Sequence, residues 1–202
     1  MNVFAGTLTV PEVSGLMIGL YIQSMFFCWA GAIGSATSYL VGNLMGENKV
    51  ALAKAYLRIG GYCSLTTAGI IEILVILFAD NLARFYSGDE EIQEKIELVL
   101  RLFLLLYPPD FVSCVLGSSL RAIGKQRVGS LIIIVNLYCI TIPFVWISCL
   151  GFDAGLYGVV FGFIISVWIN LFSYLFVFSK TDWNEQARQI IEKLKADQNA
   201  TK

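Results

Sequence analysis

Five apolar stretches occupy most of the chain, and the charged residues gather between them. The stretches cover residues 14–42, 59–79, 98–120, 128–150 and 155–178, and each contains few or no charges. A helix of about 20 residues, rising 1.5 Å per residue, crosses a hydrocarbon core of roughly 30 Å. We therefore predict an all-α fold, a polytopic membrane helix bundle with about five transmembrane helices.

The connections between these stretches alternate in charge. Residues 47–58 and 121–127 are mostly basic, residues 80–97 are mostly acidic, and Asp153 is the one charge in the fourth connection. Lysine and arginine accumulate in short cytoplasmic loops. The pattern thus predicts that 47–58, 121–127 and the tail are cytoplasmic and that 80–97 is external. The N-terminus then faces outward, which suggests that the chain is a piece of a longer protein.

The tail, residues 181–202, has a different pattern. Apolar residues recur at helical spacing at positions 183, 187, 190, 191 and 194 within a polar peptide. An amphipathic helix on the cytoplasmic membrane face, with Trp183 at the interface, and a frayed solvated tail both fit this pattern.

Composition excludes several classes of function. The chain is 57% hydrophobic, with a mean hydropathy of +0.72 and a net charge of −1, so charge gives no case for nucleic-acid binding. It has no histidine, and its five cysteines fall within or beside apolar stretches without a close pair. We therefore expect no disulfide, metal site or catalytic centre. An intramembrane aspartyl protease is disfavoured because the chain has no G-x-G-D motif.

Asp110 is the first of two acids that lie deep in the apolar stretches. A charge near the bilayer centre costs at least about 2.5–3.5 kcal/mol, so it normally faces protein or water. Asp110 directly follows Pro108 and Pro109, which should kink the helix and leave carbonyls without intrahelical partners. Transporters build cation sites from such broken helices. We predict that Asp110 carries a proton or another cation; the alternative is a structural kink whose aspartate bonds a neighbouring helix.

Glu72 is the second such acid, and its setting is less informative. Aliphatic residues flank it on both sides, and nothing nearby marks a helix break. It could pair with Arg101 on the next helix or lie protonated against another helix. It is therefore the weaker candidate for a transport role.

Two motifs resemble those of the multidrug and toxic compound extrusion (MATE) transporters. The string from Gly34 to Asn48, GSATSYLVGNLMGEN, is similar to the small-residue helix of that family and its V-G-N-x-L-G-like end. The string from Gly117 to Gly129, GSSLRAIGKQRVG, is similar to the family's G-x-x-R-G-x-G-x-Q-x-x-G loop, with Ala122 in place of a glycine. The residues that match family motifs are Gly42, Asn43, Gly46, Arg121, Gly124, Gln126, Gly129 and Pro143.

The resemblance implies a two-lobe transporter of twelve helices, of the eukaryotic type. Residues 1–180 would then be part of the C-terminal lobe, with helices 8–12, and the N-terminal lobe needed for transport would be missing. Asp110 lies eleven residues before Arg121, where the family's tenth-helix acid is expected. The family's seventh-helix acid would lie upstream of Met1.

The function implied is antiport that exports drug-like organic cations in exchange for H⁺ or Na⁺, without another cofactor. Tyr107, Tyr138 and Glu72 are further candidates for the substrate or coupling site, the two tyrosines through cation–π contact. The resemblance places the protein in the plasma membrane or in a vacuolar or other organelle membrane.

Two alternatives remain open from the sequence. One is a lipid or polysaccharide flippase of the same superfamily, although such flippases usually line their cavity with several basic residues. The other is a membrane fragment that does not transport.

Overall fold

The computed structural model describes residues 8–151 and 155–200, and these are almost entirely helical. The elements are α1 (Val10–Gly46), α2 (Val50–Tyr86), α3 (Glu90–Leu102), the 3₁₀ turn η1 (Phe103–Leu105), α4 (Tyr107–Ala122), α5 (Gln126–Val135), the π-helix η2 (Asn136–Thr141), α6 (Ile142–Gly151), α7 (Gly155–Lys180) and α8 (Trp183–Ala200). The described residues contain no strand. The all-α prediction is confirmed.

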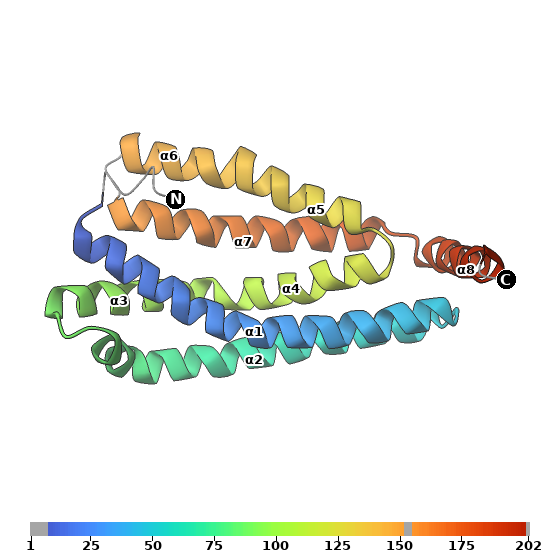
Figure 1. Cartoon of the computed structure of the whole chain (residues 1–202), viewed down its shortest axis with the longest axis horizontal. Coiled ribbons are helices and arrows are strands. Elements are labelled where there is room, and N and C mark those ends of the chain that lie inside the picture. The colour runs from blue at the N-terminus through green and yellow to red at the C-terminus, as the bar shows by residue number, and fades with distance from the viewer. Residues whose placement is uncertain (1–7, 152–154, 201–202) are drawn as a thin grey trace.

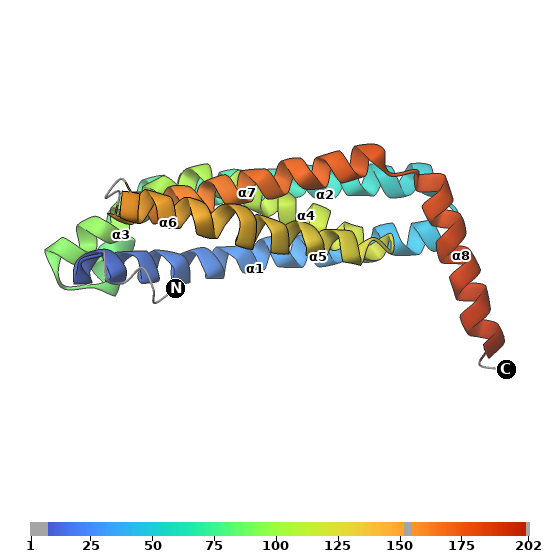
Figure 2. The same ribbon diagram turned by 90° about the horizontal axis from the view of Figure 1, so that it is seen from above.

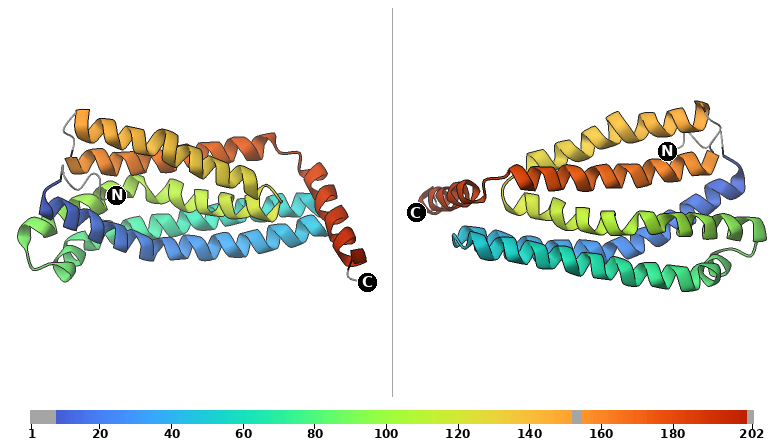
Figure 3. Two further views of the ribbon diagram at one scale, coloured as in Figure 1. Left: turned by 45° about the horizontal axis from the view of Figure 1, so that its top comes forward. Right: turned by 180° about the vertical axis from the view of Figure 1, so that it is seen from behind.

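The long helices lie side by side along the long axis of the molecule, and α8 stands across one end (Figures 1 and 2). Four spans, α1, α2, Gln126–Cys149 and α7, are long and apolar enough to cross a membrane. The fifth is the pair Glu90–Leu105 and Tyr107–Ala122, bent by 55°. Seen from behind, α4 and α7 run between the α1–α2 pair and the α5–α6 helix (Figure 3). The predicted five-helix bundle is thus confirmed.

The predicted bounds of two connections are wrong. Residues 47–58 and 80–97 are mostly helix, because α2 extends from Val50 to Tyr86 and α3 begins at Glu90. An apolar window marks only the part of a helix that lies in hydrocarbon, whereas the helix continues into the polar headgroups. The turn at 47–49 and the one at 123–125 lie at the end that carries α8 (Figure 1), as the charge pattern requires. Asp153 lies outside the described residues.

The helix ends at these two turns share one backbone geometry. Asn48 and Gly124 have positive φ, 60° and 80°. The following amides donate five residues back, from Lys49 to the Leu44 carbonyl at 2.8 Å and from Lys125 to the Leu120 carbonyl at 2.9 Å. Both are Schellman caps, in which a left-handed residue reverses the chain. This geometry explains why the second motif has a glycine at position 124.

The predicted kink at the two prolines is present. Helix α3 ends in the 3₁₀ turn η1, and α4 starts beside Pro108 and Pro109. Pro109 has no N–H to donate to the carbonyl of Leu105, four residues back. The indole nitrogen of Trp168, on α7, donates to that carbonyl at 3.1 Å instead. The break is therefore stabilised by a neighbouring helix.

A second irregularity precedes Pro143, where the chain widens into η2. The Nδ2 of Asn136 donates to the carbonyl (2.7 Å) and the hydroxyl (3.0 Å) of Ser166 on α7. The hydroxyl of Thr141 donates to the Asn136 carbonyl at 3.0 Å. Side chains thus add hydrogen bonds at the π-helical turn that precedes Pro143.

The tail forms α8, and its first turns pack against the bundle. Trp183 and Ala187 are buried in a cluster with Val41 and Met45 of α1 and Ala53 of α2. The apolar side of α8 therefore covers the ends of the first two helices.

Candidate functional site

Asp110 lies in the first turn of α4, directly after the helix break. Its carboxylate Oδ2 accepts a hydrogen bond from the Nε2 of Gln23, on α1, at 2.8 Å. A helix start favours negative charge, because its backbone dipoles present their positive end there. A charge-assisted bond from a neutral amide stabilises the carboxylate further. The break, the helix start and Gln23 together hold one carboxylate inside the bundle.

A cavity of about 450 Å³, lined by both polar and apolar residues, extends from Asp110 toward the α4–α5 turn. Arg121 lies at its other end, about 16 Å away along the helix at 1.5 Å per residue. Among the described residues, Asp110 is the one acid that lines it and Arg121 the one base. Four helices contribute lining residues: Phe27, Gly31 and Ser35 from α1; Asp110, Ser113, Cys114, Gly117, Ser118 and Arg121 from α4; Gln126, Gly129, Ser130 and Ile133 from α5; Asn170 and Tyr174 from α7.

Three buried oxygen atoms near this cavity have no hydrogen-bond partner in the part of the chain that the structure describes. They are Oε1 of Gln23, Oγ of Ser113 and Oδ1 of Asn170. A buried polar atom without a partner costs free energy, so such atoms normally meet water or a ligand. Carbonyl, hydroxyl and carboxylate oxygens are ligands for hard cations. This surface is chemically suited to a small hydrated cation.

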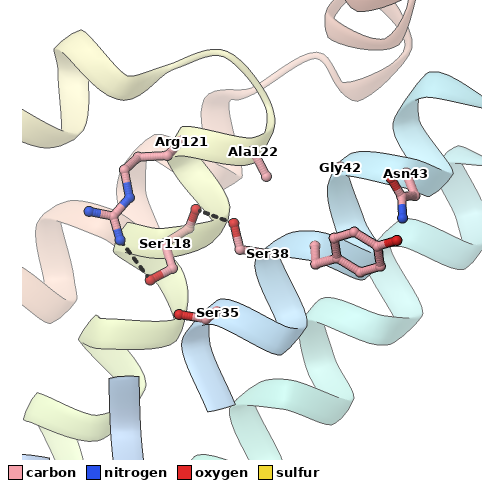
Figure 4. Close-up of a pocket in the computed structure, with 8 residues that line it drawn as sticks. Ser35, Ser38, Gly42, Asn43, Ser118, Arg121 and Ala122 are labelled. Atoms are coloured by element: carbon pink, nitrogen blue, oxygen red, sulfur yellow. Dashed lines mark hydrogen bonds between the residues drawn. The ribbon is translucent and has the colours of Figure 1, made fainter. Parts of the chain in front are cut away.

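A second cavity, of about 430 Å³, is shown in Figure 4 and adjoins the first. Ser35, Ser118 and Arg121 line both. The hydroxyl of Ser38 donates to the Ser118 carbonyl at 2.9 Å, and Nη2 of Arg121 donates to the Ser118 hydroxyl at 3.0 Å. In Figure 4 the Arg121 guanidinium points away from Asn43. Hydroxyl groups thus connect the surroundings of Asp110 with the end of α1.

Most of the motif residues lie around these cavities. Gly42 and Asn43 line the second cavity, Gln126 and Gly129 line the first, and Arg121 lines both. The other three act on the backbone or the packing: Gly124 caps α4, Pro143 follows η2, and Gly46 lies beside Leu194 of α8.

The other candidates, Tyr107, Tyr138 and Glu72, do not line the cavity that Asp110 lines. Tyr107 is fully buried and meets Phe26 and Phe111 edge to face, with centroids 6.1 and 6.5 Å away. Tyr138 is 64% exposed on the outside of the bundle, and Glu72 is half-buried. None of the three lines either cavity.

The pair suggested between Glu72 and Arg101 is not formed. Arg101 instead donates through Nε to Glu97, one turn earlier on its own helix, at 2.9 Å. A partner at i−4 is always within reach on a helix, whereas a partner on another helix requires matching depth.

Sequence reasoning missed Gln23, Ser113, Ser118, Asn170 and Tyr174. The signal for two of them was visible, because Gln23 and Asn170 are amides within otherwise apolar stretches. Serine and tyrosine occur throughout these stretches, so the sequence offers no means to select Ser113, Ser118 or Tyr174.

The MatE family model matches residues 1–147 of the chain. Multidrug and toxin extrusion protein 2 of Mus musculus is 25% identical over 185 residues, which cover 92% of this chain and 32% of that protein. An uncharacterized transporter of Saccharomyces cerevisiae is 34% identical over 132 residues, which cover 65% of this chain and 19% of that protein. The chain thus spans about a third or less of the length of these relatives.

Solved structures share the fold. The crystal structure of the eukaryotic MATE transporter AtDTX14 aligns with a TM-score of 0.85 at 20% identity, covering 91% of this chain and 41% of that one. The MATE transporter ClbM in complex with Rb⁺ aligns at 0.82 and 18% identity, covering 92% and 44%. With its apolar spans, the chain is a multi-pass integral membrane protein, and its named relatives are transporters, not enzymes. The chain belongs to the MatE family.

Proposed function

We propose that this chain is the C-terminal lobe, helices 8–12, of an antiporter that exports organic cations in exchange for H⁺ or Na⁺. One observation carries the proposal: the Asp110 carboxylate, held by Gln23 at a helix break, borders a cavity with several polar lining residues inside the lobe. A carboxylate in such a place can exchange one cation for another, and this exchange can shift the balance between two conformations.

The charge of the cavity supports a cation as the coupling partner. It has one acid near its inner end and one base beside the turn, among the described residues. A flippase of anionic lipid-linked substrates would need several bases at mid-depth, so that alternative is less well supported. The ClbM neighbour was solved in complex with Rb⁺, a monovalent cation.

The substrate would bind between two lobes, because alternating access requires two bodies that move relative to each other. Tyr138 is exposed on the outside of this bundle, so a second lobe or lipid would cover it. Its role in binding an organic cation, like those of Tyr107 and Glu72, remains a prediction.

We expect the 202-residue chain alone not to transport. Proteoliposomes that contain either this chain or a two-lobed protein with this chain as its C-terminal half would be compared for uptake of tetraethylammonium driven by a pH or Na⁺ gradient. The two-lobed protein should accumulate the cation and the chain alone should match empty liposomes.

The oligomeric state must be measured in the same preparations, because a dimer of this chain would also have two lobes. Uphill accumulation by the monomeric chain would contradict the proposal, and so would a folded two-lobed protein that transports with neither gradient.

A further inference from the structure

A separate basic pocket lies at the end of the bundle that carries α8. Its volume is about 290 Å³, and it shares no described lining residue with the two cavities near Asp110. It lies between the first turns of α2 and the connection from α7 to α8. The lining residues are Lys54, Leu57, Arg58, Phe178, Ser179, Thr181 and Trp183.

The residues that line this pocket carry a net positive charge. Lys54 and Arg58 lie one turn apart on α2, and neither takes part in an ion pair with another described residue. No carboxylate from the described part of the chain lines the pocket. Asp182, between the lining residues Thr181 and Trp183, does not line the pocket and accepts backbone N–H groups at the start of α8. The pocket therefore favours an anion.

An aromatic pair forms the apolar wall of the pocket. The rings of Phe178 and Trp183 stack with centroids 5.6 Å apart. The Lys54 ammonium lies 5.5 Å from the centroid of the Trp183 ring, in cation–π range. Tryptophan is enriched where the membrane meets water. The wall thus places a positive charge beside an apolar surface at the edge of the membrane.

A third positive group, the ammonium of Lys125, contacts the lining residue Thr181. The hydroxyl of Thr181 donates to the Val177 carbonyl at 2.7 Å and accepts from Nζ of Lys125 at 2.8 Å. Lys125 comes from the α4–α5 turn, so separate segments bring positive groups together here. The resulting potential is stronger than that of a single exposed lysine.

We propose that this pocket binds the phosphate group of an anionic phospholipid in the adjacent leaflet. Lys54 lies four residues into α2, about 6 Å from the helix start, which is a depth suited to headgroups. Arg58 can donate two parallel hydrogen bonds to one phosphate, and Lys54 adds a point charge. Phe178 and Trp183 flank the apolar part of the lipid. Basic pockets between membrane helices bind phospholipid headgroups in this way.

The test is native mass spectrometry of the purified chain in neutral detergent, with phosphatidylglycerol or phosphatidylcholine added. The parental chain should retain phosphatidylglycerol in preference to phosphatidylcholine. The double variant Lys54→Gln/Arg58→Gln should retain at least about tenfold less phosphatidylglycerol than the parental chain, because it loses the charged donors. The matched control, Arg84→Gln/Arg101→Gln, removes the same charge from bases that pair with acids on their own helices. It should bind as the parent does.

Two further measurements distinguish a bound lipid from free phosphate and from a loss of fold. The variant Lys54→Arg/Arg58→Lys keeps both charges and should retain the lipid, and circular dichroism should show the same helix content in all variants. Inorganic phosphate in large excess should leave phosphatidylglycerol bound, because it cannot use the aromatic wall. If inorganic phosphate displaces phosphatidylglycerol, the pocket binds free phosphate and the proposal of a lipid ligand is wrong. The proposal would also be wrong if Lys54→Gln/Arg58→Gln retained as much phosphatidylglycerol as the parental chain. It would be wrong as well if the parental chain retained phosphatidylcholine and phosphatidylglycerol equally.

Discussion

Replacing Asp110 with asparagine should abolish cation-driven transport by a two-lobed protein that contains this chain, to the level of empty liposomes. The change preserves the shape of the side chain and an oxygen that can accept the hydrogen bond from Gln23. It removes the charge that can be exchanged for a coupling cation. The measurement is tetraethylammonium uptake across imposed pH and Na⁺ gradients, with circular dichroism to show that the protein is folded.

Glu72→Gln is the matched control for this experiment. It makes the same change from carboxylate to amide at a half-buried position that lines neither cavity near Asp110. We expect it to reduce transport less than Asp110→Asn does. If Asp110→Asn transports at the parental rate and with the parental pH dependence, the aspartate only stabilises the helix break.

The second large effect concerns Gly15, where α1 packs closely against the backbone of α3. A methyl group at this position would lie 2.6 Å from Lys95 Cβ and 2.9 Å from its carbonyl carbon. Backbone atoms cannot rotate away, so Gly15→Ala should separate the two helices and cost about 1–3 kcal/mol. In a chain of this length the melting midpoint falls by roughly 2–12 °C, which thermal unfolding in detergent would measure.

Gly31 provides the control on the same helix. A methyl group there would meet no described atom within 4 Å apart from the neighbouring residues and backbone of its own helix. Because alanine favours a helix over glycine, Gly31→Ala should melt at the parental temperature or above it. A Gly15→Ala protein as stable as Gly31→Ala would show that α1 and α3 are not in close contact.

The five spans could be predicted from the sequence because the bilayer imposes a minimum length on each apolar stretch. The ends of the helices could not. Residues 47–58 contain four charges, yet α2 includes Lys54 and Arg58, because helical hydrogen bonds continue past the hydrocarbon and charged side chains extend into the headgroups.

Asp110 could also be predicted, because a charge within an apolar stretch is costly enough to require a reason. Its partner could not. Gln23 is visible as an amide in an apolar stretch, but it is 87 residues away, and nothing in the sequence pairs it with Asp110. The bond depends on the depth at which α1 and α4 cross, which the arrangement of helices determines. The same holds for Asn170 on α7 and for the failed pairing of Glu72 with Arg101.

The most direct test of the coupling role of Asp110 is infrared spectroscopy of the purified 202-residue chain, which does not require a second lobe. The stretching band of a protonated carboxyl group would be followed while pH is cycled with and without added Na⁺ or Rb⁺. We predict that this band appears and disappears reversibly as the concentration of the proton, Na⁺ or Rb⁺ is changed. The band should be absent from Asp110→Asn and present in Glu72→Gln. A spectrum that Asp110→Asn leaves unchanged at every pH and cation concentration would contradict the coupling role.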